Sequence, residues 1–190
     1  MRTFIAVEIP NEIQERIGAY ISEISNIMDE VKWVAPHNLH FTIKFLGEIS
    51  NSDFMNVKEC VEEVASEIRS FTMGISGIGF FPSQQQPKVI WLGADGGENS
   101  LLDLYQDMER RLEEIGFDRE AKTFSPHLTI GRVKKFKRME VPVLFKDFDP
   151  ATFEVGSIAI IKSTLAPDGP IYEKIFETEL KTFETLEREF

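Results

Sequence analysis

The chain has few of the residues on which many enzyme classes depend, and each shortage excludes something. Its 190 residues include one cysteine, Cys60, so neither an internal disulfide nor a cysteine-built metal site can form. We expect Cys60 to be a buried, unreactive thiol in a helix. No apolar run approaches the roughly 20 residues that a membrane-spanning helix requires. The first residues also lack the apolar core and cleavage site of a secretory signal, which predicts a cytoplasmic protein without membrane contact.

Positive charge is scarce as well. The chain has 21 Lys and Arg against 32 Asp and Glu, for a formal net charge of -11. A field of this sign repels polyanions, which argues against a broad surface that coats nucleic acid. A small basic site is still allowed, because salt screens the global field beyond about 8 Å. Residues 134–138 (Lys-Lys-Phe-Lys-Arg) are one candidate for such a site, and an ordinary solvated loop explains them equally well.

Apolar periodicity predicts strands and helices in a repeated order around one core. The predicted strands cover residues 3–9, 39–46, 71–80, 89–93, 126–133, 153–163 and 171–178. One helix begins at residue 11, with apolar positions from Ile13 to Met28, a second follows capping residues 50–53, and a third covers 101–115. Residues 81–87 read as a loop between the halves. The order strand, helix, strand in each half predicts a duplicated α+β fold with a central cleft.

The most informative residues are histidines, of which the chain has three. Residues 40–43 (His-Phe-Thr-Ile) and 127–130 (His-Leu-Thr-Ile) show one pattern twice, 87 positions apart. The chain has 10 threonines. The chance that two of its three histidines have a threonine at position i+2 is therefore only about one in a hundred. On a strand, the His and Thr of each motif project from the same face, and the two apolar residues project from the other.

Two such strands facing each other would supply two imidazoles that titrate near neutral pH and two hydroxyl donors. A strained cyclic phosphodiester needs one base to activate water and one acid to protonate the leaving oxygen, and two histidines can do both without a metal. Thr42 and Thr129 would hydrogen-bond the non-bridging phosphate oxygens. The motif pair therefore predicts hydrolysis of a cyclic phosphodiester.

Two cations near the motifs are further candidates for phosphate binding. The Arg132 guanidinium could clamp a phosphate with a bidentate fork. Strict strand alternation places Arg132 on the face opposite His127, so either a bulge near Gly131 redirects its side chain or Arg132 has a structural role. Lys44, two residues after Thr42 on the same predicted face, is a weaker candidate.

Other interpretations of these residues are less favoured. A zinc site is disfavoured because neither motif brings a cysteine or carboxylate at ligand spacing. Ser125 lacks the pattern of a nucleophile elbow. His37, in a Pro-His-Asn turn without a following threonine, is best explained as structural. Four aromatic rings could stack on a nucleobase: Phe45, Phe80, Phe81 and Trp91. Most of the 16 phenylalanines must nevertheless lie in the core.

An ordered set of segments covering nearly the whole chain carries a family resemblance. The segments are residues 2–10, 33–47, 79–82, 89–93, 124–133 and 169–172. In this order the chain resembles the LigT-like RNA 2',3'-cyclic phosphodiesterases, also called ThpR or 2'-5' RNA ligases, of the two-histidine (2H) phosphoesterase superfamily.

The resemblance implies a single domain over residues 1–190, with a bilobal, pseudo-symmetric α+β fold. Two antiparallel sheets would flank a central cleft, with helices outside and one His-x-Thr motif in each lobe. It implies metal-independent hydrolysis of RNA or nucleoside 2',3'-cyclic phosphate ends to 2'-phosphomonoesters, without a cofactor. His40 would be the proton donor and His127 the proton acceptor. The phosphate would be bound by Thr42, Thr129 and Arg132.

Two alternative functions stay open at this point. Relatives can also join tRNA halves through a 2'-5' bond, the reverse of the hydrolytic reaction. A non-catalytic module that binds RNA ends is the other alternative, although mere phosphate binding would be served better by Arg and Lys than by paired histidines. We expect a monomer whose partner is an RNA or oligonucleotide with a 2',3'-cyclic phosphate end, tRNA fragments among the candidates.

Overall fold

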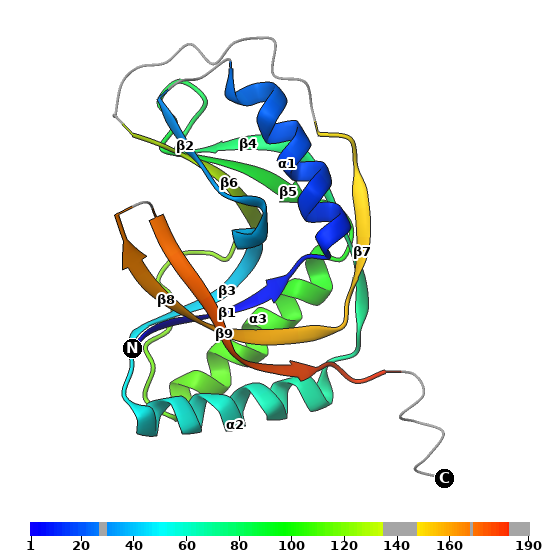
Figure 1. The fold of residues 1–190 in the computed structure, drawn as a ribbon. Coiled ribbons are helices and arrows are strands. Elements are labelled where there is room, and N and C mark those ends of the chain that lie inside the picture. The colour runs from blue at the N-terminus through cyan, green and yellow to red at the C-terminus, as the bar shows by residue number, and fades with distance from the viewer. Residues whose placement is uncertain (27–29, 135–147, 168, 183–190) are drawn as a thin grey trace.

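The two histidine motifs lie on neighbouring strands at the centre of an antiparallel sheet (Figure 1). The computed structural model describes residues 1–26, 30–134, 148–167 and 169–182. Its elements, in chain order, are β1 (Arg2–Glu8), α1 (Asn11–Ser25), β2 (Val31–Trp33), a 3-10 turn (Pro36–Asn38), β3 (His40–Glu48), α2 (Asn51–Glu67), β4 (Phe71–Phe81), β5 (Val89–Ala94), α3 (Glu98–Glu114), β6 (His127–Val133), β7 (Ala151–Val155), β8 (Ser157–Ala166) and β9 (Gly169–Glu179).

Most predicted elements are confirmed, with two differences. The strand expected over 153–163 is two strands, β7 and β8, which separate at Gly156 because they pair in different parts of the sheet. Strand β7 pairs with β4, whereas β8 pairs with β1 and β9. Strand β2 was not predicted, since three residues are too short for a periodic signal. Met28, expected in the first helix, lies outside the described residues.

The strand order shows how the halves are related. It runs β7-β4-β5-β6-β3-β1-β8-β9, with β2 beside β6. Each motif strand therefore has three strands beyond it, β5, β4 and β7 on one side and β1, β8 and β9 on the other. The two sheets expected from the sequence form one continuous sheet, joined where Phe41 of β3 lies opposite Leu128 of β6. Both of these side chains are buried in one core. The α+β class is confirmed, and we infer one domain of two related halves.

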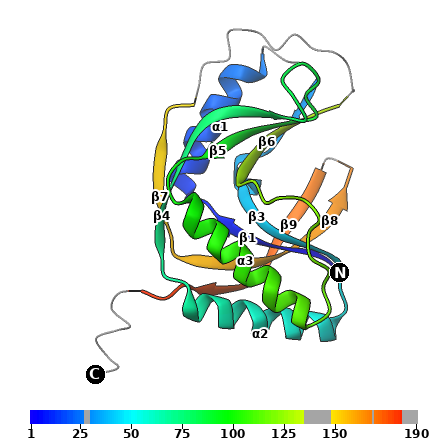
Figure 2. The same cartoon turned by 180° about the vertical axis from the view of Figure 1, so that it is seen from behind.

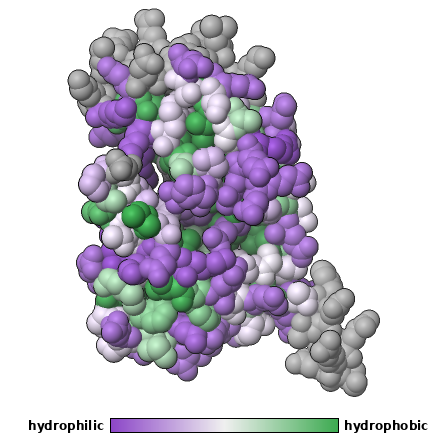
Figure 3. Space-filling model, viewed as in Figure 1, coloured by the Kyte–Doolittle hydropathy of each residue, from purple (hydrophilic) through white to green (hydrophobic). Residues whose placement is uncertain are grey.

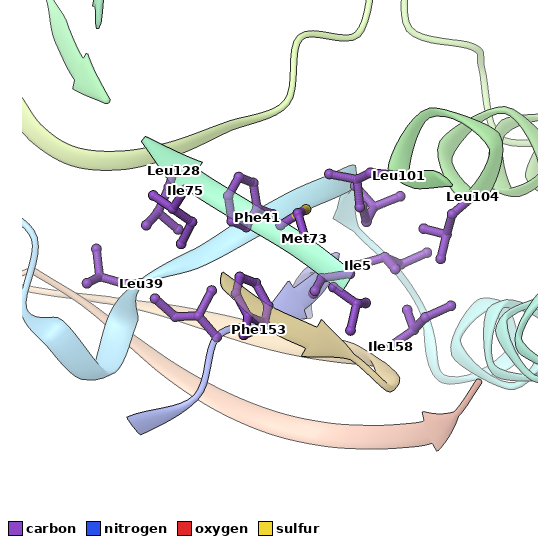
Figure 4. Close-up of a cluster of buried hydrophobic side chains, with 14 of the residues drawn as sticks. Ile5, Leu39, Phe41, Met73, Ile75, Leu101, Leu104, Leu128, Phe153 and Ile158 are labelled. Carbon is purple, nitrogen blue, oxygen red and sulfur yellow. The ribbon is translucent and has the colours of Figure 1, made fainter. Parts of the chain in front are cut away.

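The core lies on the face of the sheet opposite the two motifs. Figure 4 shows Phe41 and Leu128 among buried side chains from other elements, including Met73 of β4, Leu101 of α3 and Phe153 of β7. The alternation along both motif strands is the one predicted, with the apolar residues buried and the His and Thr half-buried. We call the face of the sheet that carries the His and Thr side chains the motif face.

Helix α2 begins where the sequence indicates, at a capping box. The Ser50 hydroxyl accepts from the backbone N–H of Asp53, and the Asp53 carboxylate accepts from the backbone N–H of Ser50. Figures 1 and 2 show α2 lying beside α3, outside the strands of one half. Cys60 of α2 is buried, as expected, and this burial raises the pKa of its thiol to about 11.

Strand β3 carries a one-residue bulge directly after its motif threonine. Ala6 of β1 lies opposite Thr42, but the preceding Ile5 lies opposite Lys44, which leaves Ile43 as the extra residue. A bulge reverses the facing of the residues beyond it relative to strict alternation. Lys44 is therefore turned towards the core.

Strand β6 has the same bulge 87 positions later. Trp91 of β5 lies opposite Thr129, and the preceding Ile90 lies opposite Gly131, so that Ile130 is the extra residue. The duplication thus extends beyond the side chains of the motif to an irregularity of the backbone. Because the bulges are equivalent, the residues that follow them are reoriented in the same way in both halves.

The position of Lys44 corrects the prediction that it binds phosphate. Its side chain is buried, its ammonium lies 2.5 Å from a carboxylate oxygen of Glu109 on α3, and it donates to the backbone carbonyl of Asp118 at 2.6 Å. The other Glu109 oxygen accepts from the backbone N–H of Glu120 at 2.8 Å. The bulge after Thr42 has therefore made Lys44 an anchor between β3, α3 and the segment that leads to β6.

This ion pair yields a prediction about stability. Lys44→Ala leaves the Glu109 carboxylate buried without its cation, so we expect the free energy of unfolding to fall by about 3 kcal/mol in urea titrations. The double variant Lys44→Met/Glu109→Leu should recover most of this loss, because it removes both charges. Lys162→Ala, which removes a partly exposed lysine at the surface, is the control and should cost less than about 1 kcal/mol. A loss for Lys44→Ala no larger than the control's would contradict the assignment.

Candidate active site

Both motif histidines are oriented by the backbone in the same way. Nδ1 of His40 lies 2.8 Å from the carbonyl oxygen of Asn38, and Nδ1 of His127 lies 2.7 Å from the carbonyl oxygen of Ser125. A carbonyl oxygen only accepts, so Nδ1 carries the proton in each ring and Nε2 is left for chemistry. The orienting residue stands two positions before the histidine in both halves, which is a second repeat hidden from the side-chain pattern.

The pairing of β3 with β6 places the two motifs against each other. Phe41 lies opposite Leu128 in an antiparallel pair. Continuing this register by one residue sets His40 against Thr129 and Thr42 against His127. Directly opposed side chains on one face are about 5 Å apart at Cβ, and diagonal neighbours about 7–8 Å apart. In this register the two imidazoles are diagonal neighbours, each beside the other motif's threonine.

His40 sits in an aromatic pocket. Phe4 stacks on its ring at a centroid distance of 4.7 Å, and Tyr172 packs edge-on at 5.3 Å. This burial lowers the pKa of His40 to about 4; the Asn38 carbonyl opposes the shift, and the positive charge of Arg132 adds to it. In the ligand-free protein His40 is therefore neutral at pH 7.

His127 has an aromatic pair of its own. Phe81 meets its ring edge-on at 5.1 Å, and Trp91 lies 6.3 Å away, stacked on Phe81 at 5.0 Å. The Trp91 ring lies against the backbone of β4, where a Cβ on Gly79 would come within 2.1 Å of the indole. Glycine at this position makes room for the indole, which in turn limits the positions open to His127.

Arg132 lies on the motif face, so the predicted bulge does redirect its side chain. Beyond the bulge at Ile130, Arg132 is opposite Val89, two residues from Trp91 on the same face of β5. Its charge lowers the pKa of both His40 and Tyr172, although burial raises that of Tyr172 overall, so the guanidinium reaches towards the other half of the sheet. The bulge that the sequence left open as an alternative is present.

Phe45 occupies the position in β3 that corresponds to Arg132 in β6. The bulge after Thr42 turns it to the motif face, where 57% of its surface is exposed and its ring centroid lies 5.9 Å from that of Phe4. Phe80, another predicted stacking candidate, packs against the core. An exposed phenyl ring on the histidine side of the sheet is a surface on which a nucleobase can stack.

Sequence reasoning did not single out Phe4 and Tyr172 as neighbours of a motif histidine. Alternation shows that Phe4 faces away from Ile5, but only the pairing of β1 with β3 brings Phe4 to His40.

His37 is exposed in the 3-10 turn, beside a cavity of about 60 Å³ that His40 and Tyr172 also line.

Two kinds of feature are absent from the described residues. No three His, Cys, Asp or Glu side chains among them converge as a metal site would require. In the same part of the chain, no helix has both the length and the apolarity to cross a bilayer.

The two histidine motifs lie on adjacent central strands of one sheet, one in each half, as the resemblance to the two-histidine phosphoesterases implies. A family model described as LigT like Phosphoesterase matches the chain twice, over residues 7–91 and 92–172, and the chain belongs to this family. The boundary between the two matches falls within β5, so each match contains one motif.

Curated relatives match over almost the full length. The chain is 34% identical over 185 residues to the RNA 2',3'-cyclic phosphodiesterase of Thermotoga maritima, covering 95% of this chain and 96% of the relative. It is 39% identical over 181 residues to the protein of the same name from Methanocaldococcus jannaschii, covering 93% and 99%.

Solved structures share the fold. The protein TT0787 of Thermus thermophilus superposes with a TM-score of 0.79 at 25% identity, covering 96% of this chain and all of that one. E. coli LigT in complex with 3'-AMP superposes with a TM-score of 0.77 at 22% identity, covering 95% and 98%. The predicted fold family is confirmed.

The environment of His40 yields a prediction about pH. In the free protein its ring should stay neutral until the pH falls to about 4, because burial penalises the imidazolium. A bound 2'-phosphomonoester adds negative charge beside the ring, so we expect the pKa to rise by at least about one unit. NMR titration of the ring signals with and without adenosine 2'-phosphate measures both values, with His37→Gln simplifying the spectrum and His127→Gln giving the assignment. A free-state midpoint near 6.5 would contradict the burial argument.

Proposed function

We propose that this protein hydrolyses the 2',3'-cyclic phosphate ends of RNA or nucleosides to 2'-phosphomonoesters without a metal ion. The observation that carries the proposal is the diagonal placement of two backbone-oriented histidines, each beside the other motif's threonine. Relatives at 34% and 39% identity over nearly the whole chain bear the name of this activity. This hydrolysis needs a general base to activate water and a general acid to protonate the leaving oxygen, one on each side of the phosphate.

In the proposed reaction His127 Nε2 takes a proton from water, whose oxygen attacks the phosphorus. The bond from phosphorus to the ribose 3'-oxygen breaks, and His40 Nε2 gives that oxygen a proton. The product carries a 2'-phosphate and a free 3'-hydroxyl. The Thr42 and Thr129 hydroxyls and the Arg132 guanidinium hold the non-bridging oxygens and stabilise the charge that develops on them.

The proposed role of His40 as an acid requires its ring to be protonated, whereas the free ring is neutral. Substrate binding would favour the protonated His40 ring that this role requires. The phosphate brings a negative charge next to His40 and also pairs with Arg132, whose positive charge otherwise opposes protonation. His40 would thus be charged as an acid only when a phosphodiester is in place, with Phe45 as the surface for its nucleobase.

The reaction is tested by product analysis in the absence of metal. An oligonucleotide with a 2',3'-cyclic phosphate end is incubated with the protein in EDTA, and the product is separated from 2'- and 3'-phosphate standards. We expect conversion to the 2'-phosphate at a rate that EDTA does not change. A 3'-phosphate product, or loss of activity on chelation, would overturn the mechanism.

The catalytic roles are tested by substitution. His40→Ala and His127→Ala should each lower kcat by about 1000-fold or more, since each removes one partner of the proton transfers, while most of the affinity for the 2'-phosphate product is kept. His37→Ala is the matched control and should retain wild-type turnover. Turnover that survives both motif substitutions would disprove the mechanism. The monomeric state, the cytoplasmic location and the use of tRNA fragments remain predictions.

A further inference from the structure

Two cations stand side by side on the motif face. Lys32 of β2 lies directly opposite Arg132 of β6, so their side chains leave the sheet on the same side. Like charges in this position repel each other. Neither has a carboxylate within ion-pair distance among the described residues, whereas Arg111 contacts three and Lys174 two. In a protein of net charge -11, a cation pair without a carboxylate partner in the described part of the chain indicates an anionic ligand.

The two cationic groups point to different places. The charge of Arg132 acts on His40 and Tyr172, at the proposed catalytic phosphate. The Lys32 ammonium lies at the turn between β8 and β9, 3.4 Å from the position that a Cβ on Gly169 would occupy. Both groups therefore belong to one basic region, in which Lys32 reaches the turn between β8 and β9.

The hairpin beside Lys32 offers an apolar surface for the sugar or base that lies between two phosphates. Strand β1 pairs with β8 only as far as Lys162, so residues 163–166 and 169–171 pair within the hairpin alone. Leu165 shares the face of Tyr172 along this arm and is 72% exposed. Figure 3 shows hydrophobic side chains exposed on this hairpin, and Figure 1 shows it projecting beside the motif strands. An exposed aliphatic group there can contact a sugar or base.

We infer that Lys32 binds the phosphodiester that precedes the terminal cyclic phosphate, so that the protein prefers oligonucleotide ends to nucleoside 2',3'-cyclic phosphates. This inference rests on the proposed function and specifies its substrate class. A nucleoside cyclic phosphate has one phosphate, which occupies the position between the histidines and leaves Lys32 without a partner. A dinucleotide has a second phosphate for Lys32, on the far side of its terminal nucleoside. Lys32 thus acts in substrate binding and not in the proton transfers.

The test compares two substrates and three variants. The value of kcat/KM is measured for a nucleoside 2',3'-cyclic phosphate and for a dinucleotide ending in one, at several salt concentrations. The wild type should prefer the dinucleotide by about tenfold, the effect of one charge-assisted phosphate contact. Lys32→Ala should lose this preference with less than a twofold change for the nucleoside substrate. The slope of log kcat/KM for the dinucleotide against log salt should shrink by about 0.7, one phosphate contact on a single strand.

Two variants control for fold and charge. Lys32→Arg should keep most of the preference, because it retains the cation. Lys162→Ala removes a lysine that pairs with Glu173 on the other face of the same hairpin, and it should behave as wild type. Equal loss on both substrates in Lys32→Ala would place Lys32 at the catalytic phosphate and overturn the second site, as would a preference that survives the substitution. If neither substrate is hydrolysed by the wild type, the proposed function itself fails.

Discussion

The site depends on one contact, the pairing of β3 with β6 where Phe41 lies opposite Leu128. Both side chains are buried in the core that the two halves share, and burial of this apolar surface holds the strands together. Because strand residues alternate between faces, fixing Phe41 and Leu128 in the core also fixes the adjacent histidines and threonines on the motif face. The register of this single pair sets which threonine accompanies which histidine, and a slip of one residue would reverse every side chain.

The equivalent bulges at Ile43 and Ile130 then give the duplicated halves different chemistry. In β3 the bulge turns Lys44 into the core and Phe45 to the motif face, and in β6 it turns Gly131 inward and Arg132 outward. One half thus offers an aromatic surface and the other a cation. A nucleotide end has the same asymmetry, with an apolar base on one side and a phosphate on the other. A nearly symmetric scaffold can therefore bind such a substrate in one orientation.

The electrostatics of the site oppose those of the molecule as a whole. A protein of net charge -11 places Arg132 and Lys32 in register on the face that carries the motif histidines. The aromatic pocket keeps His40 neutral at pH 7, which avoids a third cation beside Arg132 and Lys32. Salt screens the repulsion from distant carboxylates, so a local basic region can attract an anion although the molecule as a whole is acidic.

The sequence by itself determined the α+β elements, the duplication and the identity of the paired motifs, because these follow from local periodicity and from residue types at fixed spacing. It also identified Arg132 as a candidate, yet left its facing undecided. Only the tertiary structure decided that facing, the burial of Lys44, and the approach of Phe4 and Tyr172 to His40. The reason is physical: a bulge and a strand register are set by the neighbouring strand and the shared core, and no residue of the motif itself encodes which strand that neighbour is.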